Sequence, residues 1–138
     1  MAESLLHMEY VERIVSYVKT IPSNFVPPML QVDLPQYIQR TPKIMNGYYP
    51  DVFYYDRSCI VIGEAKTSKD VDNQHTLLQL NSYIEEVRAY SCERHIVLCS
   101  CTLAFRQLKN MIVRKKWKEE LNDITFHILD NHLLFAVL

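Results

Sequence analysis

Two strands and most of the chemically informative residues lie in one stretch, residues 48–70: YYPDVFYYDRSCIVIGEAKTSKD. Segments 50–55 and 59–66 are rich in aromatic and β-branched side chains, and a polar turn separates them, a pattern that predicts a β-hairpin. The second segment is apolar over its first four residues and then carries Glu64 and Lys66. We therefore expect a hairpin whose second strand ends in charged side chains.

The segment before this hairpin predicts one helix followed by irregular chain. Residues 4–20 place apolar side chains at helical spacing behind Ser4, whose hydroxyl can cap a helix. Five prolines then punctuate residues 21–47, so we expect extended chain and turns there, with room for one short strand.

After the hairpin, helices and strands alternate. Helical spacing of apolar residues predicts helices over 71–89 and 103–119, and the almost continuous apolar run 94–101 is typical of a strand covered on both faces. Segments 124–129 and 133–138 predict two closing strands. The last helix is expected to bury four residues: Leu103, Leu108, Ile112 and Trp117. This order predicts an α/β fold, a single domain over residues 1–138 with one central mixed β-sheet flanked by helices.

Composition excludes several classes of protein that bind nucleic acids or nucleotides. The net charge of −1 excludes a strongly basic nucleic-acid coat, so any contact with phosphates must use a local patch. With only two glycines, Gly47 and Gly63, the chain cannot form the Gly-rich phosphate loops of nucleotide-binding proteins. Two basic groups are dense enough for such a patch, and a solvated helix face explains the second equally well: Arg40 with Lys43, and Arg114-Lys115-Lys116 with Lys118.

The N-terminal residues predict a cytoplasmic protein with no membrane span. They are acidic where a signal peptide has basic residues, and no stretch approaches the roughly 18 apolar residues of a membrane helix. Four cysteines lack the spacing of metal ligands and are interpreted as buried thiols: Cys59, Cys92, Cys99 and Cys101. Four histidines lack a suitable i,i+4 partner and are interpreted as structural: His7, His95, His127 and His132.

The hairpin brings three charged residues together. Glu64 and Lys66 are two residues apart on one strand and share a face, and pairing of the two strands sets Asp51 close to Glu64. Two carboxylates and an ammonium beside an apolar run are costly to bury unpaired, and a divalent cation would remove that cost. Two carboxylates and a backbone carbonyl suit Mg²⁺. The simpler interpretation is an exposed pair of Glu64 and Lys66 at a strand edge, which contributes under about 1 kcal/mol.

These residues carry a resemblance to a known family. Pro50-Asp51, followed one strand later by Glu64-Ala65-Lys66, resembles the signature of the PD-(D/E)xK nuclease superfamily. On the next helix, Gln79 and Tyr83 are one turn apart and are similar to the QxxxY element of its RecB-like branch. The resemblance covers residues 4–101.

The resemblance implies a restriction-endonuclease-like core and metal-dependent hydrolysis of nucleic acid, with DNA favoured over RNA. Asp51, Glu64 and the Ala65 carbonyl would hold Mg²⁺ or Mn²⁺, and Lys66 would orient or deprotonate the attacking water. The helix residues Gln79 and Tyr83 would position that water or the scissile phosphate. In this family an acidic residue of the first helix often completes the site, and Glu12 fits better than Glu9 because it lies toward the apolar side of the helix.

Several alternatives remain open at the level of sequence. His75 is one turn before Gln79 and can reach the phosphate or simply face solvent. Four tyrosines suit either base stacking or the core: Tyr48, Tyr49, Tyr54 and Tyr55. The domain can instead be a catalytically silent nuclease-fold module that binds nucleic acid or a protein, or an interaction protein with an accidental motif. The partners expected for a nuclease are nucleic acid and either a second copy, as in resolvases, or a larger nuclease or helicase complex.

Overall fold

The computed structural model describes residues 4–67, 74–132 and 134–138. Its helices and strands, in chain order, are α1 (Leu5–Val18), β1 (Leu30–Val32), β2 (Val52–Tyr55), β3 (Cys59–Lys66), α2 (Gln74–Arg88), β4 (Glu93–Ser100), α3 (Thr102–Glu119), β5 (Thr125–Asp130) and β6 (Phe135–Val137). Two short 3-10 turns precede β1 and β2: η1 (Pro27–Met29) and η2 (Met45–Gly47). Each predicted helix and strand is present to within two residues in the described chain, and positions 71–73 of the predicted second helix lie outside it.

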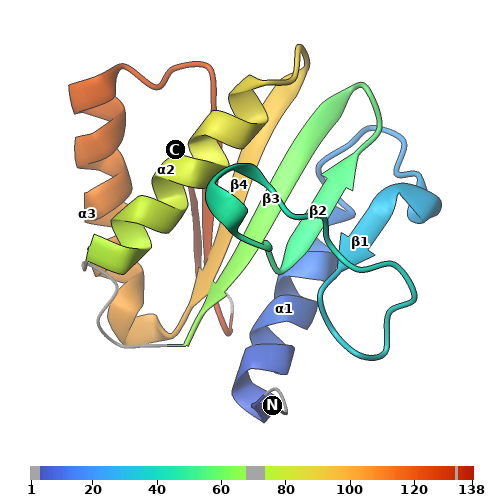
Figure 1. Cartoon of the computed structure of the whole chain (residues 1–138). Helices are drawn as coiled ribbons and strands as arrows, with labels where there is room; N and C mark the ends of the chain where they lie inside the picture. The colour runs from blue at the N-terminus through green and yellow to red at the C-terminus, as the bar shows by residue number, and fades with distance from the viewer. Residues whose placement is uncertain (1–3, 68–73, 133) are drawn as a thin grey trace.

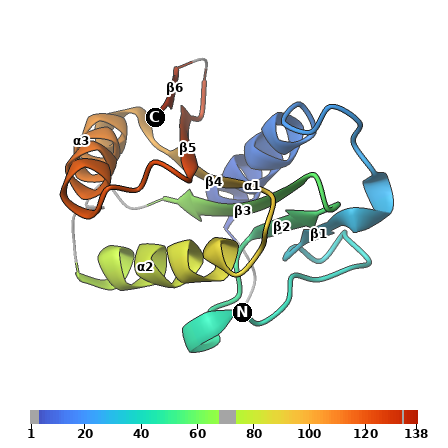
Figure 2. The same ribbon diagram turned by 90° about the horizontal axis from the view of Figure 1, so that it is seen from above.

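Within the described residues, six strands form one open mixed sheet in the order β1-β2-β3-β4-β5-β6 (Figure 1). The central strands β3, β4 and β5 are parallel, and β1, β2 and β6 pair with their neighbours in antiparallel fashion. Figure 2 shows α1 on one face of the sheet, with α2 and α3 on the other. The structure therefore confirms the predicted α/β class with a central mixed sheet flanked by helices. None of the described helices is long and apolar enough to cross a membrane.

Strand β3 is buried on both faces because its side chains alternate between two cores. Ile60 and Ile62 pack with α2 and α3, whereas Val61 packs with α1. Gly63 allows α1 to lie close to the sheet, since a Cβ atom there would come within 2.6 Å of Ile14 Cγ2. The β2–β3 hairpin pairs Val52 with Gly63. Asp51, which precedes Val52, therefore lies opposite Glu64, which follows Gly63. This register brings positions 51 and 64 together, as the hairpin pattern predicts.

Two residues of α3 that were predicted to be buried are exposed. Leu108 and Ile112 are fully buried as expected, but Leu103 is 71% exposed and Trp117 is 84% exposed. On a helix of 3.6 residues per turn, positions 103 and 117 lie more than 100° around the axis from 108 and 112, so one face cannot bury all four. The prediction that Leu103 and Trp117 are buried is therefore wrong.

A chain of hydrogen bonds crosses the core on the α1 face of the sheet. The Tyr17 hydroxyl lies 2.8 Å from His127 Nδ1, His127 Nε2 lies 2.9 Å from His95 Nδ1, and His95 Nε2 lies 3.1 Å from Glu93 Oε1. One arrangement of hydrogens, running from Tyr17 toward Glu93, satisfies all three bonds with both rings neutral. Burial, reinforced by the neighbouring His95, lowers the pKa of His127 to about 4, so its imidazole is neutral at pH 7.

Candidate active site

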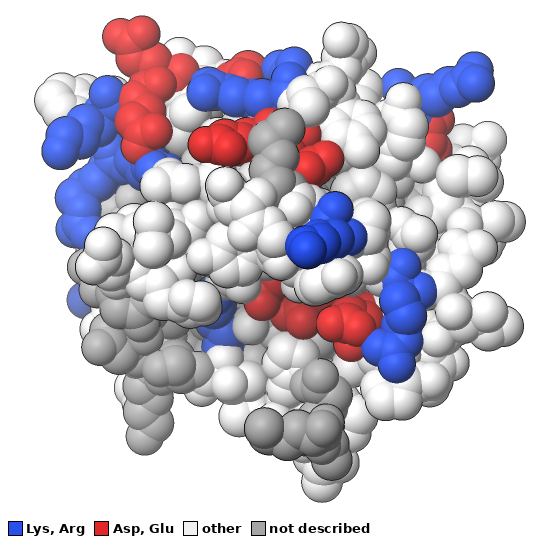
Figure 3. Space-filling view, viewed as in Figure 1, with Lys and Arg blue, Asp and Glu red and all other residues white. Residues whose placement is uncertain are grey.

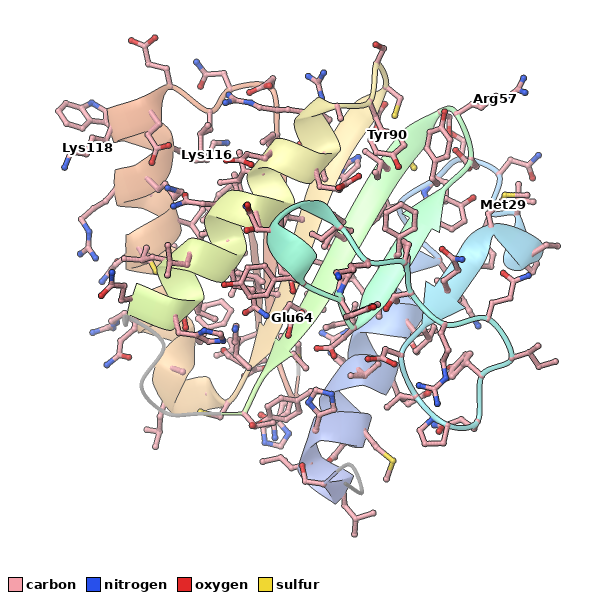
Figure 4. The ribbon with its side chains drawn as sticks, viewed as in Figure 1. Met29, Arg57, Glu64, Tyr90, Lys116 and Lys118 are labelled. Carbon is pink, nitrogen blue, oxygen red and sulfur yellow. The ribbon has the colours of Figure 1, made fainter. Side chains whose placement is uncertain are left out.

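Polar side chains from β2, β3 and α2 meet near the carboxyl end of β3. Asp51 directly precedes β2, Glu64 and Lys66 lie on β3, and Gln79 and Tyr83 reach them from α2. Figure 4 shows Glu64 on β3 beneath α2. Asp51, Glu64, Gln79 and Tyr83 are all buried, and Lys66 is half-buried. The structure thus brings together five of the residues that the sequence singled out, in a setting where water is largely excluded.

Two groups fix the orientation of the Asp51 carboxylate. The Ala65 backbone N–H donates to Asp51 Oδ2 at 2.8 Å, and His7 Nε2 lies 3.3 Å from Asp51 Oδ1. The first contact ties the end of β2 to the end of β3, and the second comes from the first turn of α1. The carboxylate is therefore held from two sides.

Pro50 removes a hydrogen-bond donor beside Ala65. The register pairs Val52 with Gly63, and extending it by two residues sets Pro50 against Ala65. A proline has no N–H, so it cannot bind the Ala65 carbonyl as an ordinary strand neighbour would. Because the N–H and C=O of one strand residue point the same way, this carbonyl is directed toward the side on which Asp51 lies.

The buried Glu64 carboxyl favours its protonated form. Its pKa is raised well above the ordinary value, first by burial and then by the negative charge of Asp51. Lys66 and a hydrogen bond from the Tyr83 hydroxyl, 2.5 Å from Glu64 Oε1, act in the opposite direction without cancelling the effect. Without a bound cation, Glu64 therefore binds a proton more readily than an ordinary carboxylate does.

Lys66 is held by the same helix. Its Nζ donates to Gln79 Oε1, and burial lowers the pKa of its ammonium, while Glu64 and Asp51 raise it. A small pocket of about 10 Å³, close to the space that one water molecule needs, lies against Lys66, Gln79 and Tyr83. The ammonium thus has a buried amide as its partner and a water-sized space beside it.

Other predicted residues lie away from this cluster. Glu12 is exposed, and its Oε1 accepts a hydrogen bond from the Tyr37 hydroxyl at 2.8 Å, so the structure does not bring it to Asp51 and Glu64. The helical wheel places Glu12 beside the apolar stripe, but it does not show which neighbour that flank meets. His75 is exposed on α2, with its ring centre 6.2 Å from that of Tyr48.

The four tyrosines proposed for base stacking have different environments. Tyr54 is fully buried and donates to Asp56, which makes it a core residue. The ring of Tyr48 packs against the buried Tyr83, and the ring of Tyr55 packs against the partly buried Tyr90. Of the four, Tyr49 alone is mainly exposed, at 56%.

The sequence did not indicate the contact of His7 with Asp51. His7 was interpreted as structural because it has no metal-binding partner one turn away. One signal was available, since His7 continues the stripe of Val11, Ile14 and Val18 at helical spacing and so faces the sheet. The long-range contact itself depends on how α1 crosses the sheet.

Among residues 4–67, 74–132 and 134–138, no three His, Cys, Asp or Glu side chains form a group arranged to hold a metal ion. The oxygen atoms that this site presents belong to two carboxylates and, by the strand register, a backbone carbonyl. No family model, curated protein or solved structure matches the chain.

Proposed function

We propose that this protein is a divalent-metal-dependent nuclease with a restriction-endonuclease-like core, acting on nucleic acid with DNA as the favoured substrate. The observation that carries the proposal is the meeting of Asp51, Glu64 and Lys66 at the end of β3. Structural ion pairs are usually exposed, whereas the two carboxylates of this cluster are buried beside the half-buried Lys66 ammonium and the His7 ring. Perturbed, buried titratable groups of this kind concentrate at functional sites.

Asp51, Glu64 and the Ala65 carbonyl would hold Mg²⁺ or Mn²⁺. The donor chemistry fits, because Mg²⁺ prefers one or two carboxylates and leaves its other positions to water and phosphate oxygens. The raised pKa of Glu64 supports the same assignment, since a cation would replace the proton that Glu64 binds. When bound, such a cation lowers the pKa of a coordinated water and offsets negative charge on a phosphate.

The protein's own side chains would then orient the reactants. Lys66, whose pKa is lowered by burial, would accept a proton from the attacking water or, when charged, offset negative charge on the phosphate. Gln79 fixes the position of the Lys66 amine, and Tyr83 fixes that of the Glu64 carboxylate. The water oxygen bonds to phosphorus, the ester P–O bond breaks, and the leaving oxygen takes a proton from solvent.

A cleavage assay tests this proposal. Linear, circular, branched and single-stranded DNA are incubated with Mg²⁺ or Mn²⁺, and the wild type is compared with Glu64→Ala and Lys66→Ala. We expect the wild type to cut at least one substrate only when the metal is present, and both variants to lose that activity. Equal activity in all three proteins would remove the catalytic assignment.

A second candidate function rests on a different observation. Glu64 already accepts a hydrogen bond from Tyr83, Lys66 donates to Gln79, and Asp51 accepts from the Ala65 N–H, so each of these three side chains has a partner within the protein. A catalytically silent nuclease-fold module that binds nucleic acid or a protein would keep such a network for stability. That module would show no metal-dependent cleavage, and EDTA would leave its melting temperature unchanged.

A further inference from the structure

Helix α3 concentrates positive charge on one edge of the molecule. Six of its 18 residues are basic and one is acidic: Arg106, Lys109, Arg114, Lys115, Lys116 and Lys118 against Glu119. Lys115 pairs with Glu119 at 2.5 Å, and Lys116 Nζ lies 5.9 Å from the centre of the Phe126 ring. Figure 4 shows Lys118 pointing away from the molecule, and Figure 3 shows basic side chains along the edge that α3 forms.

Apolar side chains are interleaved with these charges. Trp117 is 84% exposed, and Leu103 and Val113 are also largely exposed. Arg106, Val113 and Trp117 follow one line along the helix, at i, i+7 and i+11, opposite the buried side. A merely solvated face does not require an exposed indole, whereas basic side chains around an exposed aromatic ring suit a strand with unpaired bases.

A hollow between α3 and α2, at one flank of this outward face, lies next to the candidate active site. Met111 contributes both to the small pocket beside Lys66 and to this hollow of about 310 Å³, lined by Arg114 and Lys118. Lys66 pairs with Ser100 at the end of β4, and α3 begins two residues later at Thr102. An 18-residue helix is about 27 Å long, so a strand that leaves the site can follow α3 for several nucleotides.

We propose that the outward face of α3, formed by Leu103, Arg106, Lys109, Val113, Arg114, Trp117 and Lys118, binds a single-stranded segment of nucleic acid. Its basic side chains contact the phosphates, and the Trp117 indole stacks on an unpaired base. The identification of this segment as the substrate rests on the proposed function, but binding by the α3 face does not require cleavage.

Trp117 is the only tryptophan in the chain, so its fluorescence reports directly on this surface. A 15-nucleotide oligo-dT is titrated into the full chain in EDTA, which prevents metal-dependent cleavage, and binding is followed by indole emission and by anisotropy of a labelled oligonucleotide. The test variants are Arg114→Glu/Lys118→Glu and Trp117→Ala. The matched control, Lys19→Glu/Arg57→Glu, changes net charge equally at exposed sites on α1 and the β2–β3 turn.

We expect quenching of the Trp117 emission on binding. Loss of two phosphate contacts should weaken binding about 25-fold at 0.1 M salt. It should also reduce by about 1.4 the slope of the logarithm of the binding constant against the logarithm of the salt concentration. Trp117→Ala should weaken binding roughly fivefold or more, and the control should bind like the wild type. Three results would overturn the inference: an indole emission that does not change at saturation, a control variant that loses as much affinity as the test variant, or no binding to oligo-dT. The last result would favour a protein partner. Binding without cleavage in Mg²⁺ would leave the α3 surface standing and remove the proposed catalysis.

Discussion

Two buried polar networks lie on opposite faces of the same sheet, and they differ in how their charge is balanced. On the α1 face, Tyr17, His127 and His95 form a row of hydrogen bonds, and the lowered pKa of His127 keeps its ring neutral at pH 7. Under α2, two carboxylates face one ammonium, and burial together with the charge of Asp51 raises the pKa of Glu64. A buried polar group is therefore not by itself a sign of a site, whereas a buried excess of charge that a ligand can neutralise is one.

The largest expected difference between the two networks is in catalysis. Glu64→Ala should lower Mg²⁺-dependent cleavage by about a thousandfold or more, because it removes a ligand and one carboxylate of the pair. His127→Gln, which alters the neutral network, should leave the rate within about twofold under conditions where both variants are folded. Similar losses in the two variants would show that the assay reports stability rather than chemistry.

The second difference is in acid stability. The folded-state pKa of His127 is about 4, below its unfolded value, so the unfolded chain binds more protons between about pH 6.5 and pH 4. The free energy of unfolding should therefore fall as pH is lowered through this window, by about 3 kcal/mol. In His127→Gln this acid-dependent loss should be absent, and in the exposed His132→Gln it should remain. Urea unfolding at a series of pH values measures it.

The third difference is a loss of stability as pH rises, the opposite of the change expected for His127. The folded-state pKa of Glu64 is raised, so without metal the folded protein holds a proton that the unfolded chain releases above about pH 4.5. Stability should therefore fall as pH rises above this value, up to the folded-state pKa. Glu64→Gln should remove that dependence and stabilise the metal-free protein at pH 8 by about 0.5–2 kcal/mol. A less stable Glu64→Gln protein at pH 8 would contradict the assigned charge imbalance.

The smallest expected effects on the cleavage rate are those of substitutions at two residues of α1, His7 and Glu12. His7→Gln should lower the cleavage rate only severalfold, because the Ala65 N–H still orients Asp51. Glu12→Gln should leave the rate unchanged, since Glu12 bonds to Tyr37 away from the cluster. If a normally folded Glu12→Gln variant lost most of the cleavage rate, Glu12 would have to be part of the active site.

The sequence predicts local geometry better than the positions of helix side chains. The hairpin that joins Asp51 to Glu64 follows from strand composition and a short turn, and the spacing of Gln79 and Tyr83 places both on one side of α2. The partners of Glu12 and the contact of His7 depend on the path of α1 over the sheet, which Gly63 and Ile14 determine by close packing.

The sequence also did not fully predict which side of α3 is buried. The almost continuous apolar run along β4 predicts a strand covered on both faces without knowledge of its neighbours. A helix with six basic residues has a weak apolar pattern, so its buried side is fixed by Ala104, Leu108 and Met111 packing on the sheet rather than by its largest side chain. Trp117 is therefore a surface residue, and the binding surface that we propose on α3 includes a position that was predicted for the core.

Thermal melting with Mn²⁺ or EDTA at pH 8 tests most directly whether Asp51 and Glu64 hold a divalent cation. When Mn²⁺ exceeds its Kd a hundredfold, the wild type should melt about 5–10 °C higher than in EDTA, because a ligand that binds only the folded state stabilises it by about 2.7 kcal/mol. Asp51→Asn and Glu64→Gln should show no such rise. A wild type indifferent to Mn²⁺, or a rise of equal size in both variants, would contradict the assignment of these two carboxylates.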